Sequence, residues 1–395
     1  MHLIRRIAAP LVLCPPMPPI RFGVLTFEDG RLVDIQSVDR AVLDSMASVE
    51  FFNGIIVPSW TNAHCHLELS YLYGSIAQNQ GLDGFIRNLD SVRDNTCTVD
   101  RIAAASFRQA QMFAEGTSLV ADICNDTYGL SLKCGSGVEY HNFVELFGLR
   151  DSDSAVNKIC RKGDSVAELC VDLGLEYSLT PHSAYSVSDR LMSQIARSDE
   201  NMPVSVHFME DPAELELFES RGALYERYQS AGLNVDFRDC HTPAERLIKH
   251  FSSDRPLLLV HNTFVREEDI DRINDYFSNV TWVLCPRSNQ YISKWQPPIE
   301  LLRKKGCRIA LGTDSLASNS SLLMCDEVKF VLGEHSGLSL EEVVMWATTA
   351  GRVALKSLSD NPSVEQIFAG GATLIENVDW ANCTLTAESI SRRLI

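Results

Sequence analysis

Two histidines separated by one residue, His64 and His66, are the residues of this sequence best placed to do chemistry. They follow the apolar residues 55–57 in the stretch GIIVPSWTNAHCHLE, which predicts one strand with a polar end. Because successive strand side chains point to opposite faces, both imidazoles should share a face and Cys65 should point away. Two imidazoles on one strand end make half of a metal site. Such a pair also occurs by chance on half-exposed strands, so other residues must complete the site.

Polar residues at the ends of four later apolar runs can complete it. They are His182, His207, His261 and Asp314. Alone, each histidine would more often be a hydrogen-bonded structural residue, and the aspartate a helix N-cap. The right residue types at five strand ends in order favour one shared site instead.

Eight apolar strands that alternate with helices would position these side chains. We expect the strands at residues 54–68, 118–124, 141–149, 176–180, 203–210, 256–260, 281–285 and 308–312. Continuous apolar strands between helices indicate a parallel sheet, and eight of them indicate a closed (β/α)₈ TIM-type barrel of the α/β class. The polar residues would then meet at the carboxyl ends of the strands. An open doubly wound sheet should show a glycine-rich phosphate loop after a strand, and the sequence has none.

Both ends of the chain have strand character outside this pattern. Residues 24–36 predict a hairpin around Asp29 and Gly30, and residues 373–377 and 383–386 return to strand character near the end.

Composition restricts the partners and the compartment. The 395 residues include 35 Lys and Arg against 52 Asp and Glu, a net charge of -17, which argues against nucleic acid as a partner. No apolar run approaches the roughly 18 residues of a membrane span, and prolines interrupt the short apolar patch of the N-terminus. The 12 cysteines are scattered without a CxxC pair, so we expect a reduced, cytoplasmic protein.

Six motifs give the chain a family resemblance. NAHCH, TPHSAYSVS, VHFME, LVHNTF, CPRSN and LGTDS occur in this order. With them the chain resembles the amidohydrolase superfamily, in the branch of cytosine, adenosine and aminofutalosine deaminases. The resemblance implies a hydrolase barrel over residues 57–359. It also implies a small β-sandwich built from both termini, residues 1–56 and 360–395.

The resemblance also implies the roles of individual residues. It assigns one Zn²⁺, with Fe²⁺ as the alternative, to His64, His66, His207 and Asp314, and the absence of a lysine at the fourth strand end favours a single ion. Glu210, three residues after His207, would be the general acid/base, although alone it reads equally well as a first-turn helix residue. His261 would orient the attacking water, and Asp314 would count among the catalytic residues. Substrate contacts are assigned to Glu68, His182 and Arg287, although Arg287 could equally well pair with an acidic neighbour.

We therefore expect a cytoplasmic, mononuclear metal-dependent deaminase of an aminated heterocycle that releases ammonia. The ring would be a purine nucleoside derivative, a pterin or a pyrimidine, and HCHLE with PHSAYSVS most resembles deaminases of adenine nucleosides, such as the aminofutalosine type. One alternative is a hydrolase with another leaving group, acting on a chlorinated triazine or a cyclic amide. A second is a non-catalytic metal-containing barrel that acts as a binding protein, which would have no use for Glu210. The expected partner is a small heterocyclic substrate, and we expect neither nucleic acid nor a membrane as a partner. The sequence is compatible with a homodimer.

Overall fold

Eight parallel strands form the centre of the computed structural model, which describes residues 3–233, 235, 237, 240–356 and 358–395. The strands lie in two four-stranded sheets, ordered β6-β7-β8-β9 and β10-β11-β12-β13. Their bounds are β6 Trp60–Cys65, β7 Thr117–Cys124, β8 Glu139–Leu146, β9 Glu176–Pro181, β10 Val204–Phe208, β11 Leu257–His261, β12 Val280–Leu284 and β13 Ile309–Leu311. Single parallel bridges connect the two sheets, Ser183 with His207 and Cys65 with Asp314.

Alternation along these strands separates two apolar layers. In β7, Leu119, Ala121 and Ile123 join one buried cluster with side chains of the opposite sheet, while Val120 packs in a different cluster with α3. Every residue of β7 is buried, as expected of a strand in a parallel sheet covered by helices. The predicted class of alternating strands and helices is confirmed.

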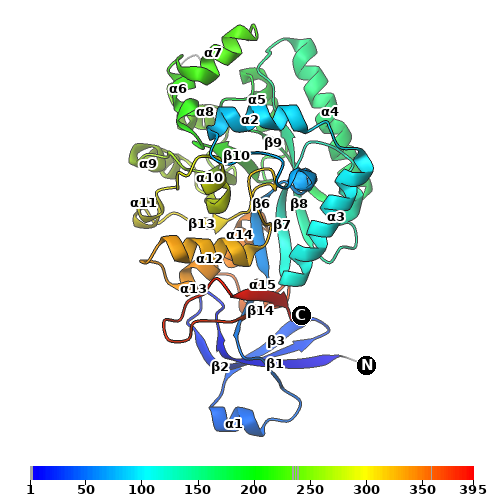
Figure 1. Ribbon diagram of the computed structural model, residues 1–395, viewed down its shortest axis with the longest axis vertical. Coiled ribbons are helices and arrows are strands. Elements are labelled where there is room, and N and C mark those ends of the chain that lie inside the picture. The colour runs from blue at the N-terminus through cyan, green and yellow to red at the C-terminus, as the bar shows by residue number, and fades with distance from the viewer. Residues whose placement is uncertain (1–2, 234, 236, 238–239, 357) are drawn as a thin grey trace.

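Helices and short 3₁₀ turns connect and cover the strands (Figure 1). Up to residue 250 they are η1 Leu67–Leu72, α2 Gly81–Val92, α3 Thr98–Glu115, η2 Leu130–Lys133, α4 Asp153–Asp172, α5 Asp189–Ala196, α6 Pro212–Phe218, α7 Gly222–Ser230 and α8 Pro243–His250. After it they are α9 Glu267–Tyr276, α10 Pro286–Ile292, α11 Ile299–Lys304, α12 Met324–Glu334, α13 Leu340–Ala347, α14 Thr349–Leu355 and α15 Val364–Ile367. No helix in the described ranges is both long and apolar enough to cross a membrane.

The two ends of the chain share one seven-stranded sheet (Figure 1). Its order is β15-β14-β5-β1-β2-β3, with β4 also paired to β1. The strands are β1 Ile4–Val12, β2 Ile20–Glu28, β3 Arg31–Ser37, β4 Glu50–Phe51, β5 Ile55–Pro58, β14 Ala372–Glu376 and β15 Ile390–Arg393, and helix α1 spans Arg40–Ser45. Chain segments far apart in the sequence therefore build one unit.

The terminal hairpin is confirmed, and one terminal strand was wrong. β2 and β3 pair antiparallel around Asp29 and Gly30, whose φ angles of 49° and 82° provide the left-handed turn. The predicted strand at 383–386 is absent from the described residues there, and Ile390–Arg393 pairs with β14 instead.

The stretch that carries the histidine pair is two strands, not the one we predicted. β5 pairs with β14 and β1 in the terminal sheet, whereas β6 pairs with β7 in the parallel sheet. The hydrogen-bond partner changes at Ser59, whose N–H donates to the carbonyl of Gly371, while Trp60 N–H donates to Gly116. An apolar run has the same pattern in either sheet, so only the partners reveal the break.

Candidate metal centre

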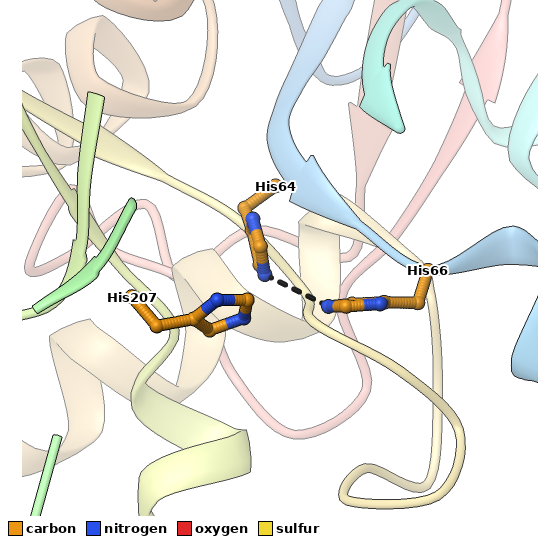
Figure 2. Close-up of side chains that lie close together, drawn as sticks. All are labelled: His64, His66 and His207. Atoms are coloured by element: carbon orange, nitrogen blue, oxygen red, sulfur yellow. Dashed lines mark hydrogen bonds between the residues drawn. The ribbon is translucent and has the colours of Figure 1, made fainter. Parts of the chain in front are cut away.

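His64 and His66 point their rings to the same place, as the spacing predicted. His64 lies in β6 and His66 just beyond it, and their Nε2 atoms are 3.2 Å apart (Figure 2). Cys65 points away into an apolar cluster with Val120 and Tyr140. The strand thus separates two imidazoles from a buried neighbour in an apolar cluster.

His207 at the end of β10 joins them from the other sheet (Figure 2). Its Nδ1 donates to the carbonyl oxygen of His182 over 2.7 Å, so the lone pair of Nε2 is available to a metal ion. One nitrogen each of His64, His66 and His207 lies within 4.8 Å of the others.

Asp314 follows β13. Among the described residues, its side chain is the one carboxylate that contacts both His64 and His66. Its Oδ1 lies 3.4 Å from His66 Nε2 and 3.8 Å from His64 Nε2. Its Oδ2 accepts hydrogen bonds from Ser288 Oγ at 2.6 Å and Ser318 Oγ at 2.7 Å, which orient the carboxylate. We call His64, His66, His207 and Asp314 the ligand cluster.

The donor set of the ligand cluster fits a divalent transition ion. Two donors about 2.1 Å from one ion at a tetrahedral angle lie about 3.4 Å apart, close to the separations among His64, His66 and Asp314. Burial lowers the pKa of His64, as does the nearby His207, and burial lowers the pKa of His66 to about 3 despite Asp314. Both imidazoles are therefore neutral, the form that binds a metal.

Glu210 and His261 face each other beside the ligand cluster. Met209 has a φ of 48°, a left-handed turn after β10, and Glu210 Oε1 then lies 3.6 Å from His261 Nε2. His261 Nδ1 donates to Asn289 Oδ1 over 2.8 Å, so its Nε2 carries the lone pair. Burial raises the pKa of Glu210 to about 8, so this carboxyl can hold a proton near neutral pH.

His182 lies against the ligand cluster rather than within it. Its ring stacks on His207 with centroids 4.5 Å apart, and Ser186 Oγ lies 3.1 Å from its Nδ1. Burial lowers the pKa of His182 to about 4, so the ring presents a neutral face.

Glu68 and Arg287, the other two predicted substrate contacts, bond elsewhere. Glu68 Oε2 accepts from Asn125 N–H over 3.1 Å. Arg287 donates to Ser320 Oγ over 2.6 Å and lies 3.8 Å from Asp326 at the start of α12. Arg287 thus lies next to an acidic residue, which was the alternative to a substrate contact. The substrate roles of Glu68 and Arg287 remain predictions.

Glu145 lies beside the ligand cluster and was not predicted from the sequence. It lies near the end of β8, and its Oε1 is 3.7 Å from His207 Nδ1 without a hydrogen-bond partner. Burial raises the pKa of this carboxyl. A charged residue within the apolar run HNFVELFGL was the available signal, because strands of this kind rarely bury a carboxylate without a role.

Comparisons with known proteins give one family profile and several similar deaminases. The profile of the Amidohydrolase family matches residues 55–359. An adenosine deaminase of Helicobacter pylori is 28% identical over 344 residues, covering 84% of this chain and 82% of that protein. A 5'-deoxyadenosine deaminase of Methanococcoides burtonii is 23% identical over 366 residues, covering 87% and 77%. The crystal structure of Helicobacter pylori aminofutalosine deaminase with methylthio-coformycin superposes with a TM-score of 0.75 at 25% identity, covering 91% of this chain and 89% of that one.

Proposed function

The chain belongs to the amidohydrolase family, and from that premise we propose that it is a mononuclear metal-dependent deaminase of an adenosine-type nucleoside. The observation that carries the proposal is the convergence of three neutral imidazoles and one oriented carboxylate beside a carboxyl that can hold a proton. The named relatives deaminate adenosine, 5'-deoxyadenosine and aminofutalosine, which supports an adenine nucleoside as the substrate class.

In this proposal His64, His66, His207 and Asp314 hold one Zn²⁺, with Fe²⁺ as the alternative. When bound, the ion supplies the Lewis acid that lets water act as a nucleophile near neutral pH. Ser288 and Ser318 keep one carboxylate oxygen of Asp314 occupied, so that only the other faces the histidines.

Glu210 and His261 handle the protons of the reaction. The Nε2 lone pair of His261 accepts a hydrogen bond from the attacking water and orients it. The ionised form of Glu210 takes a proton from this water and, once protonated, delivers it toward the amino group; a pKa raised to about 8 makes both forms accessible near neutral pH. The water oxygen bonds to the ring carbon, the carbon–nitrogen bond breaks, and ammonia leaves with the delivered proton. His182 would contact the ring, Glu68 and Arg287 its polar substituents.

The fold proposal completes this assignment. We propose that the two parallel sheets close into one eight-stranded barrel over residues 57–359, supported by the bridges of Cys65 with Asp314 and Ser183 with His207. The terminal sheet would be part of a small β-sandwich formed by residues 1–56 and 360–395, supported by the pairing of β5 with β14.

A substrate panel tests the proposed function. Purified protein with Zn²⁺ should release ammonia from adenosine or a 5'-substituted adenosine, and not from cytosine, an aminopterin, a cyclic amide or a chlorinated triazine. The Asp314→Ala variant, purified identically, controls for deaminases of the expression host. Turnover of only the amide or the triazine would replace the proposal with a different leaving group. No turnover of any compound by a metal-loaded protein would favour a binding protein.

A further inference from the structure

Helix α6 buries an acidic residue that the proposed chemistry does not use. Glu214, in the first turn of this helix, has no exposed surface. Its Oε1 has no hydrogen-bond partner among the described residues. Burial raises the pKa of the carboxyl well above its ordinary value, although the N–H groups of Glu210 and Met209 oppose the rise. A carboxyl is rarely buried to this degree without a role, so its contacts are informative.

The hydrogen bond of Glu214 reaches past the start of its helix to the proposed general acid/base. Its Oε2 accepts the backbone N–H of Glu210 over 3.2 Å. In an ordinary capping box, a glutamate at this position accepts the N–H of the N-cap residue itself. Here the N-cap is Asp211, whose own side chain accepts the N–H of Ala213 over 2.9 Å. Glu214 therefore fixes the residue before the helix, and helix capping alone does not account for this bond.

The backbone that leads to Glu210 needs such a restraint. Met209 has a φ of 48°, a left-handed conformation that is costly for a residue with a side chain and persists only where its surroundings hold it. On one side of the turn, the carbonyl oxygen of Met209 accepts the N–H of Phe264 over 2.8 Å. On the other side, the restraint is the bond between Glu210 N–H and Glu214.

This turn also sets the direction of the Glu210 side chain. Its Oε1 lies 3.6 Å from Nε2 of His261, which itself has a φ of 75°. The two groups that handle protons in the proposed reaction thus face each other from two left-handed turns. Because a side chain follows the backbone that carries it, a small rotation at Glu210 would move its carboxyl away from His261 and from the transferred proton.

We propose that Glu214 is a positioning residue for the deamination, whose buried carboxyl oxygen fixes the N–H of Glu210 and thereby aims the Glu210 carboxyl at the site of proton transfer. The inference rests on the proposed function and deepens it. Glu214 acts only through Glu210, so an uncharged side chain with the same acceptor oxygen can replace it.

Three variants that differ in this acceptor test the role. Glu214→Leu removes it, Glu214→Gln keeps an acceptor oxygen on a neutral side chain, and Glu216→Leu repeats the first change at a partly buried acid of α6 that pairs with Arg221. For the best substrate of the panel, kcat should fall roughly 10²-fold in Glu214→Leu, with little change in KM, bound metal or thermal midpoint. Glu214→Gln should recover most of this loss.

Three results of these variants would overturn the inference. They are full kcat in Glu214→Leu, an equal loss in Glu216→Leu, or a Glu214→Gln variant as poor as Glu214→Leu. Should Glu214→Leu not fold, Glu214→Met, which also lacks a carboxyl oxygen, takes its place with the same expected loss.

A double-variant cycle separates positioning from a general effect on the fold. In the Glu210→Gln background, the side chain to be positioned cannot transfer a proton. Adding Glu214→Leu to this background should therefore lower kcat by less than about threefold. The same loss as in the unaltered background would show that Glu214 acts on something other than Glu210, and would overturn the inference.

Hydrogen–deuterium exchange tests the contact without turnover. The amide of Glu210, followed in a peptide that spans residues 207–211, should exchange faster in Glu214→Leu than in the unaltered, Glu214→Gln and Glu216→Leu proteins. Unchanged exchange in Glu214→Leu would overturn the inference while the proposed function stands. If the contact is confirmed but the metal-loaded unaltered protein releases no ammonia, the proposed function fails, and the role of Glu214 in deamination fails with it.

Discussion

Two buried polar clusters lie near the end of β6, and they satisfy their charges in opposite ways. In the ligand cluster, burial lowers the pKa of His64, His66 and His207, and the neighbouring imidazoles add to the effect. In the second cluster, Lys133 Nζ lies 2.6 Å from Asp122 Oδ2, 3.1 Å from Cys124 Sγ and in a hydrogen bond with Asn142. Burial would lower the pKa of Lys133, but Asp122 and Cys124 raise it overall. We call the second group the ion-pair cluster.

The ion-pair cluster also positions the backbone next to the ligand cluster. Asp122 Oδ1 accepts the N–H of Leu67 over 2.8 Å, and Leu67 directly follows His66. Asp122 is thus shared between a closed ion pair and the chain that carries a proposed ligand.

The comparison shows that burial alone does not identify a functional group. Both clusters are almost fully buried. In the ion-pair cluster the charge of Lys133 is balanced by Asp122, whereas in the ligand cluster Asp314 is a negative charge beside neutral imidazoles. Neutral imidazoles whose ring nitrogens converge suit a cation, whereas a completed ion pair suits a structural role. Variants in the two clusters should therefore fail in different ways.

The largest expected effect is the loss of a proposed metal ligand. Asp314→Ala should reduce bound metal from one ion per subunit to a small fraction and lower turnover by several orders of magnitude. The reason is that an unbound water returns from a pKa of about 7 to about 15.7. Elemental analysis and ammonia release measure both effects. His335→Ala, at the C-terminal end of α12 and outside the cluster, should keep its metal. Two ions in the unaltered protein would contradict the one-ion assignment.

The second largest effect is expected from Glu210, the proposed general acid/base. Glu210→Gln keeps the size of the side chain but cannot transfer a proton, so turnover should fall by about 10²–10⁴-fold. Metal content and thermal midpoint should stay unchanged, because Glu210 contacts His261 and not the ligand cluster. The exposed Glu219→Gln serves as the control. A variant that lost its metal would show that Glu210 is a ligand.

The ion-pair cluster should respond in stability. Lys133→Met leaves Asp122 buried without its partner and should lower the free energy of unfolding by about 3–5 kcal/mol in urea titrations. Asp122→Asn/Lys133→Met removes both charges, retains an acceptor for Leu67 N–H, and should recover much of this loss. Full stability of Lys133→Met together with loss of turnover would place Lys133 in the reaction site and erase the contrast.

The smallest effect is a pH dependence of the metal-free protein. His66 has a pKa of about 3 when folded against 6.5 when unfolded, so the unfolded chain binds more protons between these values. Stability should therefore fall as the pH drops from 6.5 toward 3, by up to about 2 kcal/mol at pH 5 from this residue. Urea titrations of His66→Gln should show a shallower fall. The Lys133 ammonium contributes nothing in this range, since its pKa is shifted upward.

Local patterns were sufficient for much of the fold and for the first half of the site. The two-residue period of strand side chains predicted that His64 and His66 share one face, and the Asp29–Gly30 pair predicted the hairpin of β2 and β3. Apolar runs that end in His207 and Asp314 predicted that these residues lie near His64 and His66, because the carboxyl ends of parallel strands lie together. These features depend on neighbours in sequence or on a repeated element.

Tertiary structure decided what depends on distant partners. The apolar run before His64 was divided between two sheets at Ser59, since its pairing partners lie near residues 116 and 371. Packing also placed Arg287 next to Asp326 of α12, and Glu145 next to His207. Periodicity states which face of a strand is buried, but not which chain segment covers it. The sequence by itself therefore determined the residue types and their strand ends, and only three-dimensional packing determined which polar groups were paired and which were left open to a ligand.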